Sequence, residues 1–230
     1  MSWALLLLGE HFSLRCKLEA SDLEINKADW SRLLKLFQDL ASEIPDFEFL
    51  NDARSAALRP EILKRFVSLV LNDVERAKFY KLSVGCRIRE GAKIISPERL
   101  VIGEHCWIGE NAILDASGGL RIGEHTSIGP SVFIWTHSSH FANLCRNNIS
   151  GSPLIQRAST SIGSGCFISG PSVIWPGVTV GDNVVIRAFS TIDKDIPSGS
   201  LVTPSGIKTN VFTQKMIDRW LDVTMNRGSS

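Results

Sequence analysis

The chain has 230 residues, of which 43% are hydrophobic and 21% are charged, so its composition is that of a folded globular protein and excludes a disordered chain. Glycine makes up 18 residues without a G-X-Y period, which excludes a collagen-like protein. With 25 Lys and Arg against 24 Asp and Glu, the net charge of +1 gives no global electrostatic reason to expect nucleic acid or an anionic membrane as a partner.

The cysteines and the N-terminal segment indicate where the protein works. The five cysteines are an odd number without CxxC spacing, which argues against a disulfide framework or a zinc ribbon and favours a reducing compartment. The apolar run at residues 3–8 has no basic residue before it and is far shorter than the roughly 20 residues that cross a bilayer. We therefore expect a cytoplasmic protein without a membrane span.

Residues 1–83 carry helical patterns, and we expect this region to be mostly helical. Apolar residues at positions 30, 33, 34, 37, 40 and 41 have the spacing of one helix face. A second helix is predicted to begin at Pro60, with its apolar face at positions 62, 63, 66, 67, 70 and 71. Residues 46–59 are predicted to be a connector with some helical content.

From Val84 onward the sequence repeats every six residues. Fifteen hexads can be written, with two extra residues at 120–121 and an interruption at about 140–161. Thirteen hexads begin with Ile, Leu or Val, the exceptions being those at Glu90 and Ser96, and eight have Gly in second place. Such a repeat is read before any other feature of a sequence.

A period of six fits neither an α-helix, which repeats every 3.6 residues, nor a flat strand, which alternates every two. One apolar anchor followed by a residue that tolerates unusual backbone angles indicates a short strand and a corner, with each coil buried against its neighbours. At three hexads per turn the repeat gives five coils. The fold class is therefore predicted to be mainly β, followed at residues 211–230 by a short C-terminal helix and tail with apolar positions 216, 217, 220 and 223.

The hexads also carry motifs of a known family. Residues 173–181 read VIWPGVTVG, and Lys194-Asp195-Ile196-Pro197 follows. In these segments the chain resembles the hexapeptide-repeat acyltransferases, and within them the galactoside and maltose O-acetyltransferase branch and its relatives that O-acetylate polysaccharides. The resemblance implies a left-handed parallel β-helix over residues 84–210 with a loop insertion at 140–161. It also implies a homotrimer with active sites between subunits, acetyl-CoA as acyl donor and no metal.

The resemblance further implies transfer of an acetyl group to a sugar hydroxyl of a bacterial surface polysaccharide or its precursor, with a histidine as general base. Histidine suits this role because its pKa lies near neutral pH. The family places its catalytic histidine just before the loop that interrupts the repeat, and this chain has His137 and His140 there. We favour His140, because a one-residue insertion gives the T-x-S-H pattern of the family, and His137 is the alternative.

The resemblance implies further site residues at the positions that match the family's motifs. The candidates for binding the donor, as cations or backbone contacts, are Gly170, Trp175, Arg187, Ala188, Lys194 and Lys208. The candidates for contact with the acceptor sugar are Asn111 and Asp115, which as corner residues could equally satisfy backbone groups. Arg187 and Phe189 stand where the family has glycines that line the donor channel, so the pose of coenzyme A can differ here.

Three other functions are weighed against O-acetylation. N-acetylation of an amino sugar would use the same base. A non-catalytic β-helix scaffold or binding module is the alternative from another class. A γ-type carbonic anhydrase is disfavoured, because His137 and His140 are three positions apart and not the five that its zinc ligands require. Release of free thiol from acetyl-CoA in the presence of sugars would separate an enzyme from a scaffold.

Overall fold

The computed structural model describes residues 31–33, 35–36, 38–39, 52–147 and 152–227, and the chain divides into two units between Leu63 and Lys64. Residues 31–33, 35–36 and 38–39 are helical, which agrees with the helix predicted over this segment. The next helix, α3, spans Ala53–Ser68, so the prediction that it begins at Pro60 is wrong. Asp52 starts it, because its side chain accepts hydrogen bonds from the backbone N–H (3.0 Å) and the hydroxyl (2.7 Å) of Ser55.

Helix α4 (Asp73–Phe79) leads into the repeat, and a capping box formed by Asn72 and Glu75 closes its N-terminus. The Asn72 side chain accepts from the backbone of Val74 and Glu75, while the Glu75 carboxylate accepts from the Asn72 backbone at 2.8 Å. Arg76 on this helix is buried and donates to the carbonyl oxygens of Ser68 (2.7 Å), Ile88 (2.6 Å) and Leu71. It thereby ties the end of α3 and the connector before α4 to the first strand of the solenoid, and satisfies three backbone acceptors.

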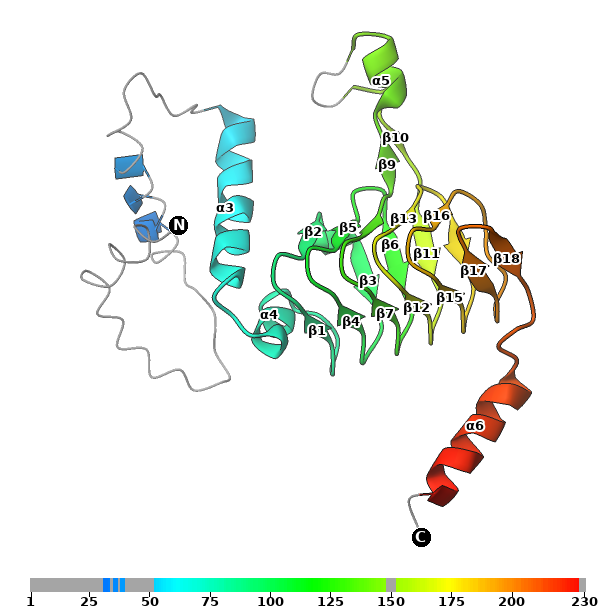
Figure 1. Ribbon diagram of the computed structural model, residues 1–230. Coiled ribbons are helices and arrows are strands. Elements are labelled where there is room, and N and C mark those ends of the chain that lie inside the picture. Colours follow the sequence, from blue (N-terminus) through cyan, green and yellow to red (C-terminus); the bar gives the residue numbers. More distant parts are fainter. Residues whose placement is uncertain (1–30, 34, 37, 40–51, 148–151, 228–230) are drawn as a thin grey trace, which may run out of the picture. The chain divides into compact units, whose positions relative to one another are not determined.

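The repeat folds into a parallel β-solenoid whose strands form three sheets (Figure 1), as predicted. Sheet A contains β1 (Arg87–Ile88), β4 (Trp107–Ile108), β7 (Ser127–Ile128), β12 (Phe167–Ile168), β15 (Val185–Ile186) and β17 (Leu201–Thr203), with β18 (Gly206–Lys208) antiparallel at its end. Sheet B contains β2 (Lys93–Ile95), β5 (Ile113–Asp115), β8 (Val132–Ile134), β13 (Ser172–Ile174) and β16 (Thr191–Ile192). Sheet C contains β3 (Leu100–Ile102), β6 (Leu120–Ile122), β11 (Thr160–Ile162) and β14 (Thr179–Val180). A short 3-10 helix, η1 (Pro97–Arg99), lies between β2 and β3.

One inward aliphatic side chain per strand stacks into a column inside each sheet. The column of sheet A is Ile88, Ile108, Ile128, Ile168, Ile186 and Val202. The column of sheet B is Ile94, Leu114, Ile134, Ile174 and Ile192. The column of sheet C is Ile102, Ile122, Ile162, Val180 and Ile196. All are buried, and together they form the core that the hexad pattern predicts.

The predicted frame of the first three hexads is wrong. Ile88 and Ile94 are the buried anchors of the first coil, whereas Val84, the predicted anchor, is 72% exposed. The reason is an unrecognised insertion: Ile94 and Ile102 are eight positions apart, as are Leu114 and Ile122. This also explains why Glu90 and Ser96 did not fit the frame, since neither occupies an anchor position.

The three corners of each coil differ in how freely they vary in length. We call them the AB, BC and CA corners, after the sheets they join in chain order. Every departure from the six-residue spacing lies at the BC corner, where successive anchors are 8, 8, 28, 6 and 4 positions apart. The longest insertion therefore leaves the solenoid at this corner and alters neither of the other two.

That insertion projects from the solenoid (Figure 1). It contains β9 (His137–Ser138), α5 (His140–Leu144) and β10 (Gln156–Arg157), and β9 and β10 form an antiparallel pair. The chain leaves the coil after Trp135, whose N–H still bonds to Ile174, and rejoins it at Thr160, whose N–H bonds to Gly119. The two strands thus form the base of the projection.

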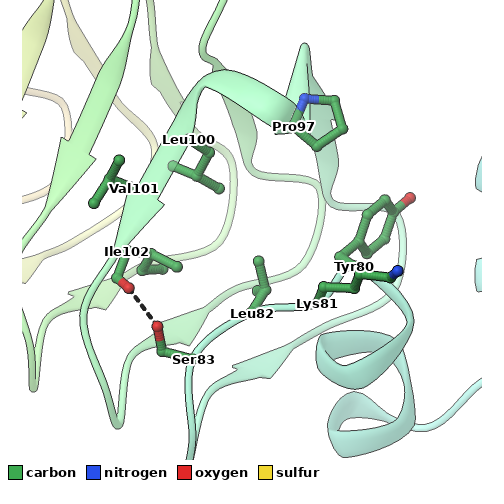
Figure 2. Close-up of a pocket in the computed structure, with 8 residues that line it drawn as sticks. All are labelled: Tyr80, Lys81, Leu82, Ser83, Pro97, Leu100, Val101 and Ile102. Atoms are coloured by element: carbon green, nitrogen blue, oxygen red, sulfur yellow. Dashed lines mark hydrogen bonds between the residues drawn. The ribbon is translucent and has the colours of Figure 1, made fainter.

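The solenoid is followed by α6 (Gln214–Arg227), which agrees with the predicted C-terminal helix. Among the residues that the structure describes, no helix has both the length and the apolar character needed to cross a membrane. A pocket of about 260 Å³ lies beside the first coil, lined by residues of 80–83 and 97–102 (Figure 2). It contains none of the predicted site residues.

Candidate active site

A hydrogen-bonded polar cluster joins the BC corners of two adjacent coils. Asp115 ends β5, and its side chain is completely buried, whereas that of His137 is 32% exposed. The Asp115 Oδ2 atom lies 2.7 Å from His137 Nδ1 and accepts from the backbone N–H (2.8 Å) and hydroxyl (3.0 Å) of Thr136. Asp115 Oδ1 accepts from the backbone N–H of Ser117 at 3.0 Å. The carboxylate is therefore held from several sides.

These bonds fix the charge of Asp115. Burial by itself raises the pKa of a carboxyl group, but the hydrogen bonds from the Thr136 and Ser117 backbone and from His137 favour the charged form more strongly. The pKa of Asp115 is therefore below its ordinary value of 3.8. At neutral pH Asp115 is an anion that can only accept hydrogen bonds.

The ionised carboxylate in turn fixes the tautomer of His137. Because Asp115 accepts, His137 Nδ1 carries the proton of the 2.7 Å bond, and Nε2 of the neutral ring is left with its lone pair. The Ser117 hydroxyl lies 3.2 Å from the same Nδ1. An imidazole that is oriented through Nδ1 and basic at Nε2 is the arrangement that general-base catalysis requires.

Backbone groups of the preceding coil and of the segment that returns from the insertion hold the start of the insertion in place. The backbone N–H of Gly118 donates to Thr136 Oγ1 at 2.7 Å, and the N–H of Ala158 donates to the Thr136 carbonyl at 2.9 Å. A Cβ atom at position 118 would lie 2.2 Å from the Thr136 carbonyl oxygen, so only glycine allows this approach. The position of His137 is thus set by backbone contacts from Gly118 and Ala158.

His140, the residue favoured from the sequence, has a different environment. It begins α5, and its Nδ1 lies 2.7 Å from the hydroxyl of Ser138 on the exposed side of the insertion. Its ring packs on Phe141 at a centroid distance of 4.0 Å. Among the described residues no carboxylate bonds to it. The geometry therefore favours His137, the alternative, over His140 as the base.

The two predicted acceptor contacts are not brought together. Asp115 is buried and accepts from the backbone of Thr136 and Ser117, as the stated alternative for a corner residue expects, and it also bonds to His137. Asn111 lies at the AB corner between β4 and β5, with a left-handed backbone (φ 57°). It belongs to a different corner from His137, and stays a prediction without support from this geometry.

The six predicted donor-binding residues divide between two corners and the end of sheet A. Trp175, which is 48% exposed, and Lys194 lie at BC corners, in the two coils that follow the insertion. Gly170, Arg187 and Ala188 lie at AB corners, where Phe189 donates its N–H to the Pro171 carbonyl of the coil before at 2.6 Å. Lys208 is exposed on β18. Within one chain these residues do not form a single site around His137.

Phe133 on the outer face of sheet B, Trp135 and His137 form a row of neighbouring aromatic rings. The Trp135 ring lies 6.4 Å from that of Phe133 and 6.0 Å from that of His137, edge to face with the latter. Residues 133, 135 and 137 share one side because side chains alternate along an extended chain. Trp135, Thr136 and Ser117 contact this cluster but had no predicted role. The coil register could have shown the Asp115 contact, since Leu114 pairs with Ile134 and Asp115 then lies beside the start of the insertion.

Comparison with known proteins agrees with the repeat. The family model described as bacterial transferase hexapeptide (six repeats) matches residues 159–194. WcaF, a candidate colanic acid biosynthesis acetyltransferase of Escherichia coli (strain K12), is 29% identical over 142 residues, which cover 62% of this chain and 72% of WcaF. The galactoside O-acetyltransferase of the same organism is 27% identical over 189 residues, covering 78% and 85% of the two chains.

Solved structures show the same architecture. A hexapeptide-repeat acetyltransferase from Vibrio cholerae O1 biovar eltor, solved with acetyl coenzyme A, has 26% identity and a TM-score of 0.50, with 74% of this chain and 95% of that chain covered. A maltose O-acetyltransferase from Clostridium difficile 630 has a TM-score of 0.55 at 24% identity, with 69% and 87% covered, and supports the fold alone. The predicted resemblance to the hexapeptide-repeat acyltransferases is therefore confirmed. The curated relatives that the chain resembles are named as acetyltransferases.

Proposed function

We propose that the protein is an O-acetyltransferase that moves the acetyl group of acetyl-CoA to a hydroxyl of a sugar, with His137 as general base. The observation that carries the proposal is the 2.7 Å bond between His137 Nδ1 and the buried Asp115, at the corner where the insertion leaves the solenoid. The donor is acetyl-CoA, in line with the acetyltransferase names of the relatives and with the ligand of the Vibrio cholerae complex. No metal is needed.

The reaction requires little beyond position and one base. His137 Nε2 takes the proton of the acceptor hydroxyl while its oxygen attacks the carbonyl carbon of the acetyl thioester. The carbon–sulfur bond then breaks, and the departing sulfur of coenzyme A takes the proton from Nε2. Asp115 stabilises the imidazolium that exists between the two proton transfers without itself being protonated.

A sugar is the acceptor that the surroundings of His137 suit best. Trp135 stands edge to face with the base at 6.0 Å and offers an apolar indole face to the carbon-bound hydrogens of a pyranose ring. The named relatives point the same way, since one is a galactoside O-acetyltransferase and another is named for the biosynthesis of colanic acid, a polysaccharide. We extend the proposal to a bacterial surface polysaccharide or its precursor as the acceptor. Acetylation of an amino sugar nitrogen by the same base is the second candidate.

The working form is proposed to be a homotrimer with a site between each two subunits. Five of the six predicted donor-binding residues divide between AB and BC corners of one chain, and contact between an AB corner of one chain and a BC corner of the next would supply both kinds to one site. The outward residues of sheets A and B include Trp107, Phe167, Phe133 and Val173, whereas the outward residues Arg121, Ser161 and Thr179 of sheet C are mainly polar. Apolar outer faces of this kind are suited to contact with other subunits.

The cytoplasm is the proposed location, because the odd set of five cysteines fits a reducing compartment.

The test is release of free thiol from acetyl-CoA, measured with a panel of neutral, amino and acidic sugars. Acetylation of a hydroxyl is expected, and mass spectrometry of the product should show an added acetyl ester that mild base removes. A product stable to base would favour the amino sugar. Absence of both binding and turnover of acetyl-CoA would support the non-catalytic scaffold instead.

A further inference from the structure

The strand that returns from the insertion places an arginine directly opposite the proposed base. In the antiparallel pair of β9 and β10, Arg157 is the partner of His137, and Gln156 is the partner of Ser138. Directly opposed residues of an antiparallel pair lie on the same face, with Cβ atoms about 4.5–5.5 Å apart. The guanidinium of Arg157 can therefore reach a molecule that is bound at His137.

Within the described ranges, the Arg157 side chain makes no hydrogen bond or ion pair, and the residue is exposed. The nearest established carboxylate of the site, Asp115, is buried and already accepts from Thr136, Ser117 and His137. An exposed guanidinium beside a base is thus available for a ligand.

The charge of the whole insertion favours an anion. Residues 135–159 contain Arg146, Arg157 and two histidines but no aspartate or glutamate, although the full chain has 24 acidic residues. The insertion is therefore positive where it contacts the solenoid and where it projects. A guanidinium binds carboxylate and phosphate oxygens through two parallel hydrogen bonds, which makes arginine the residue suited to such groups.

Two ligands could bring an anion to the site, the acceptor and coenzyme A, and their chemistry separates them. The phosphates of coenzyme A are separated from the reacting thioester by the full length of the pantetheine arm. Arg157 lies opposite the residue that acts on the reacting hydroxyl. A permanently charged anionic group that reaches Arg157 during reaction at His137 therefore belongs to the acceptor, since the acetyl thioester itself carries no charge.

We infer that Arg157 is a specificity residue that binds an acidic group of the acceptor, so that the substrate class is an acidic sugar such as a uronic acid residue. The inference rests on the proposed function, because it takes His137 as the base. It goes beyond that function in naming the charge of the acceptor and the residue that recognises it.

The experiment compares two sugars that differ mainly in one carboxylate, methyl β-D-glucuronide and methyl β-D-glucoside. Binding is measured by NMR titration of the full chain, and turnover by thiol release from acetyl-CoA. We expect the wild type to bind the glucuronide about tenfold to hundredfold more tightly, and Arg157→Met to abolish that difference without weakening binding of the glucoside. Arg157→Lys should restore part of the preference. Arg146→Met is the matched control, since Arg146 follows α5 at the outer end of the projection, and it should keep the preference (Figure 1).

Three results would overturn the inference: equal binding of the two sugars by the wild type, equal loss of both sugars in Arg157→Met, or a raised KM for acetyl-CoA in that variant. The last would assign Arg157 to the phosphates of the donor. Failure of the proposed function looks different, because the wild type would then still bind the glucuronide preferentially but would transfer no acetyl group to it.

Discussion

At the scale of single residues, the proposed chemistry depends on the environment of Asp115. Its carboxylate bonds to His137 Nδ1 at 2.7 Å and fixes the tautomer with a basic Nε2. In Asp115→Asn an amide can present its NH₂ group to Nδ1 and favour the wrong tautomer. We expect kcat to fall by about 10²–10⁴-fold with little change in the KM of either substrate. Steady-state kinetics would check this, and a variant with the wild-type kcat would show that Asp115 does not orient the base.

The same carboxylate should make the free energy of unfolding depend on pH in the acid range, because its stabilising bonds are lost when it is protonated. The folded pKa of Asp115 lies below its ordinary value of 3.8, so its contribution is complete above about pH 3.8 and is lost as the pH falls through the lower folded pKa. Urea unfolding from pH 5 down to pH 2 should show a steeper loss of free energy of unfolding below pH 3.8 in the wild type than in Asp115→Asn. Parallel curves for the two proteins would mean that the native bonds to this carboxylate contribute nothing.

The sequence alone named both histidines and favoured His140, whereas the geometry favours His137. His137 and His140 are three positions apart in one interruption of the repeat, and the T-x-S-H pattern of the family favoured His140. The ranking depends on Asp115, which lies 22 positions before His137 and reaches it only because the coils stack with Leu114 beside Ile134. The predicted frame already has Leu114 and Ile134 as anchors one coil apart, with the two extra residues at 120–121 counted, so this register was available from the sequence and was not used.

At the scale of elements, the corner at residues 115–119 works as a support for the insertion. Gly118 approaches Thr136 so closely that a Cβ atom would lie 2.2 Å from the Thr136 carbonyl oxygen. Gly118→Ala should therefore displace the start of β9 and with it His137. We expect about 1–3 kcal/mol of destabilisation, as is typical of overpacking, together with a marked fall in kcat. Unchanged kinetics, with an unchanged circular dichroism spectrum, would show that the corner does not position the base.

The elements that could be predicted are those with a strong period. The solenoid follows from the anchors, because an aliphatic residue every six positions can be buried only by stacking coils, and Ile108, Ile128 and Ile168 confirm it in one column. The start of α3 was missed because Pro60 is a common first-turn residue, whereas the cap at Asp52 lies in a segment without apolar periodicity. The pairing of Arg157 with His137 follows from a hairpin that has no repeat to indicate it.

At the scale of the whole molecule, the proposed trimer can be measured directly. Light scattering after size-exclusion chromatography should give three times the mass of one chain. Phe167, which is 52% exposed on the outer face of sheet A, offers a test of the contact. Phe167→Lys should reduce the mass toward that of one chain and remove activity, while Thr179→Lys on sheet C should change neither. An active wild-type monomer would contradict the site between subunits.

The central claim, that His137 oriented by Asp115 removes the proton of the acceptor hydroxyl, is tested most directly by comparing two alanine variants. Thiol release from acetyl-CoA should fall by about 10²–10⁴-fold in kcat for His137→Ala, while His140→Ala should stay within about tenfold of the wild type. Binding of acetyl-CoA, measured by calorimetry, should be the same in all three proteins. A full rate in His137→Ala together with loss of rate in His140→Ala would contradict the account and return the role of base to His140.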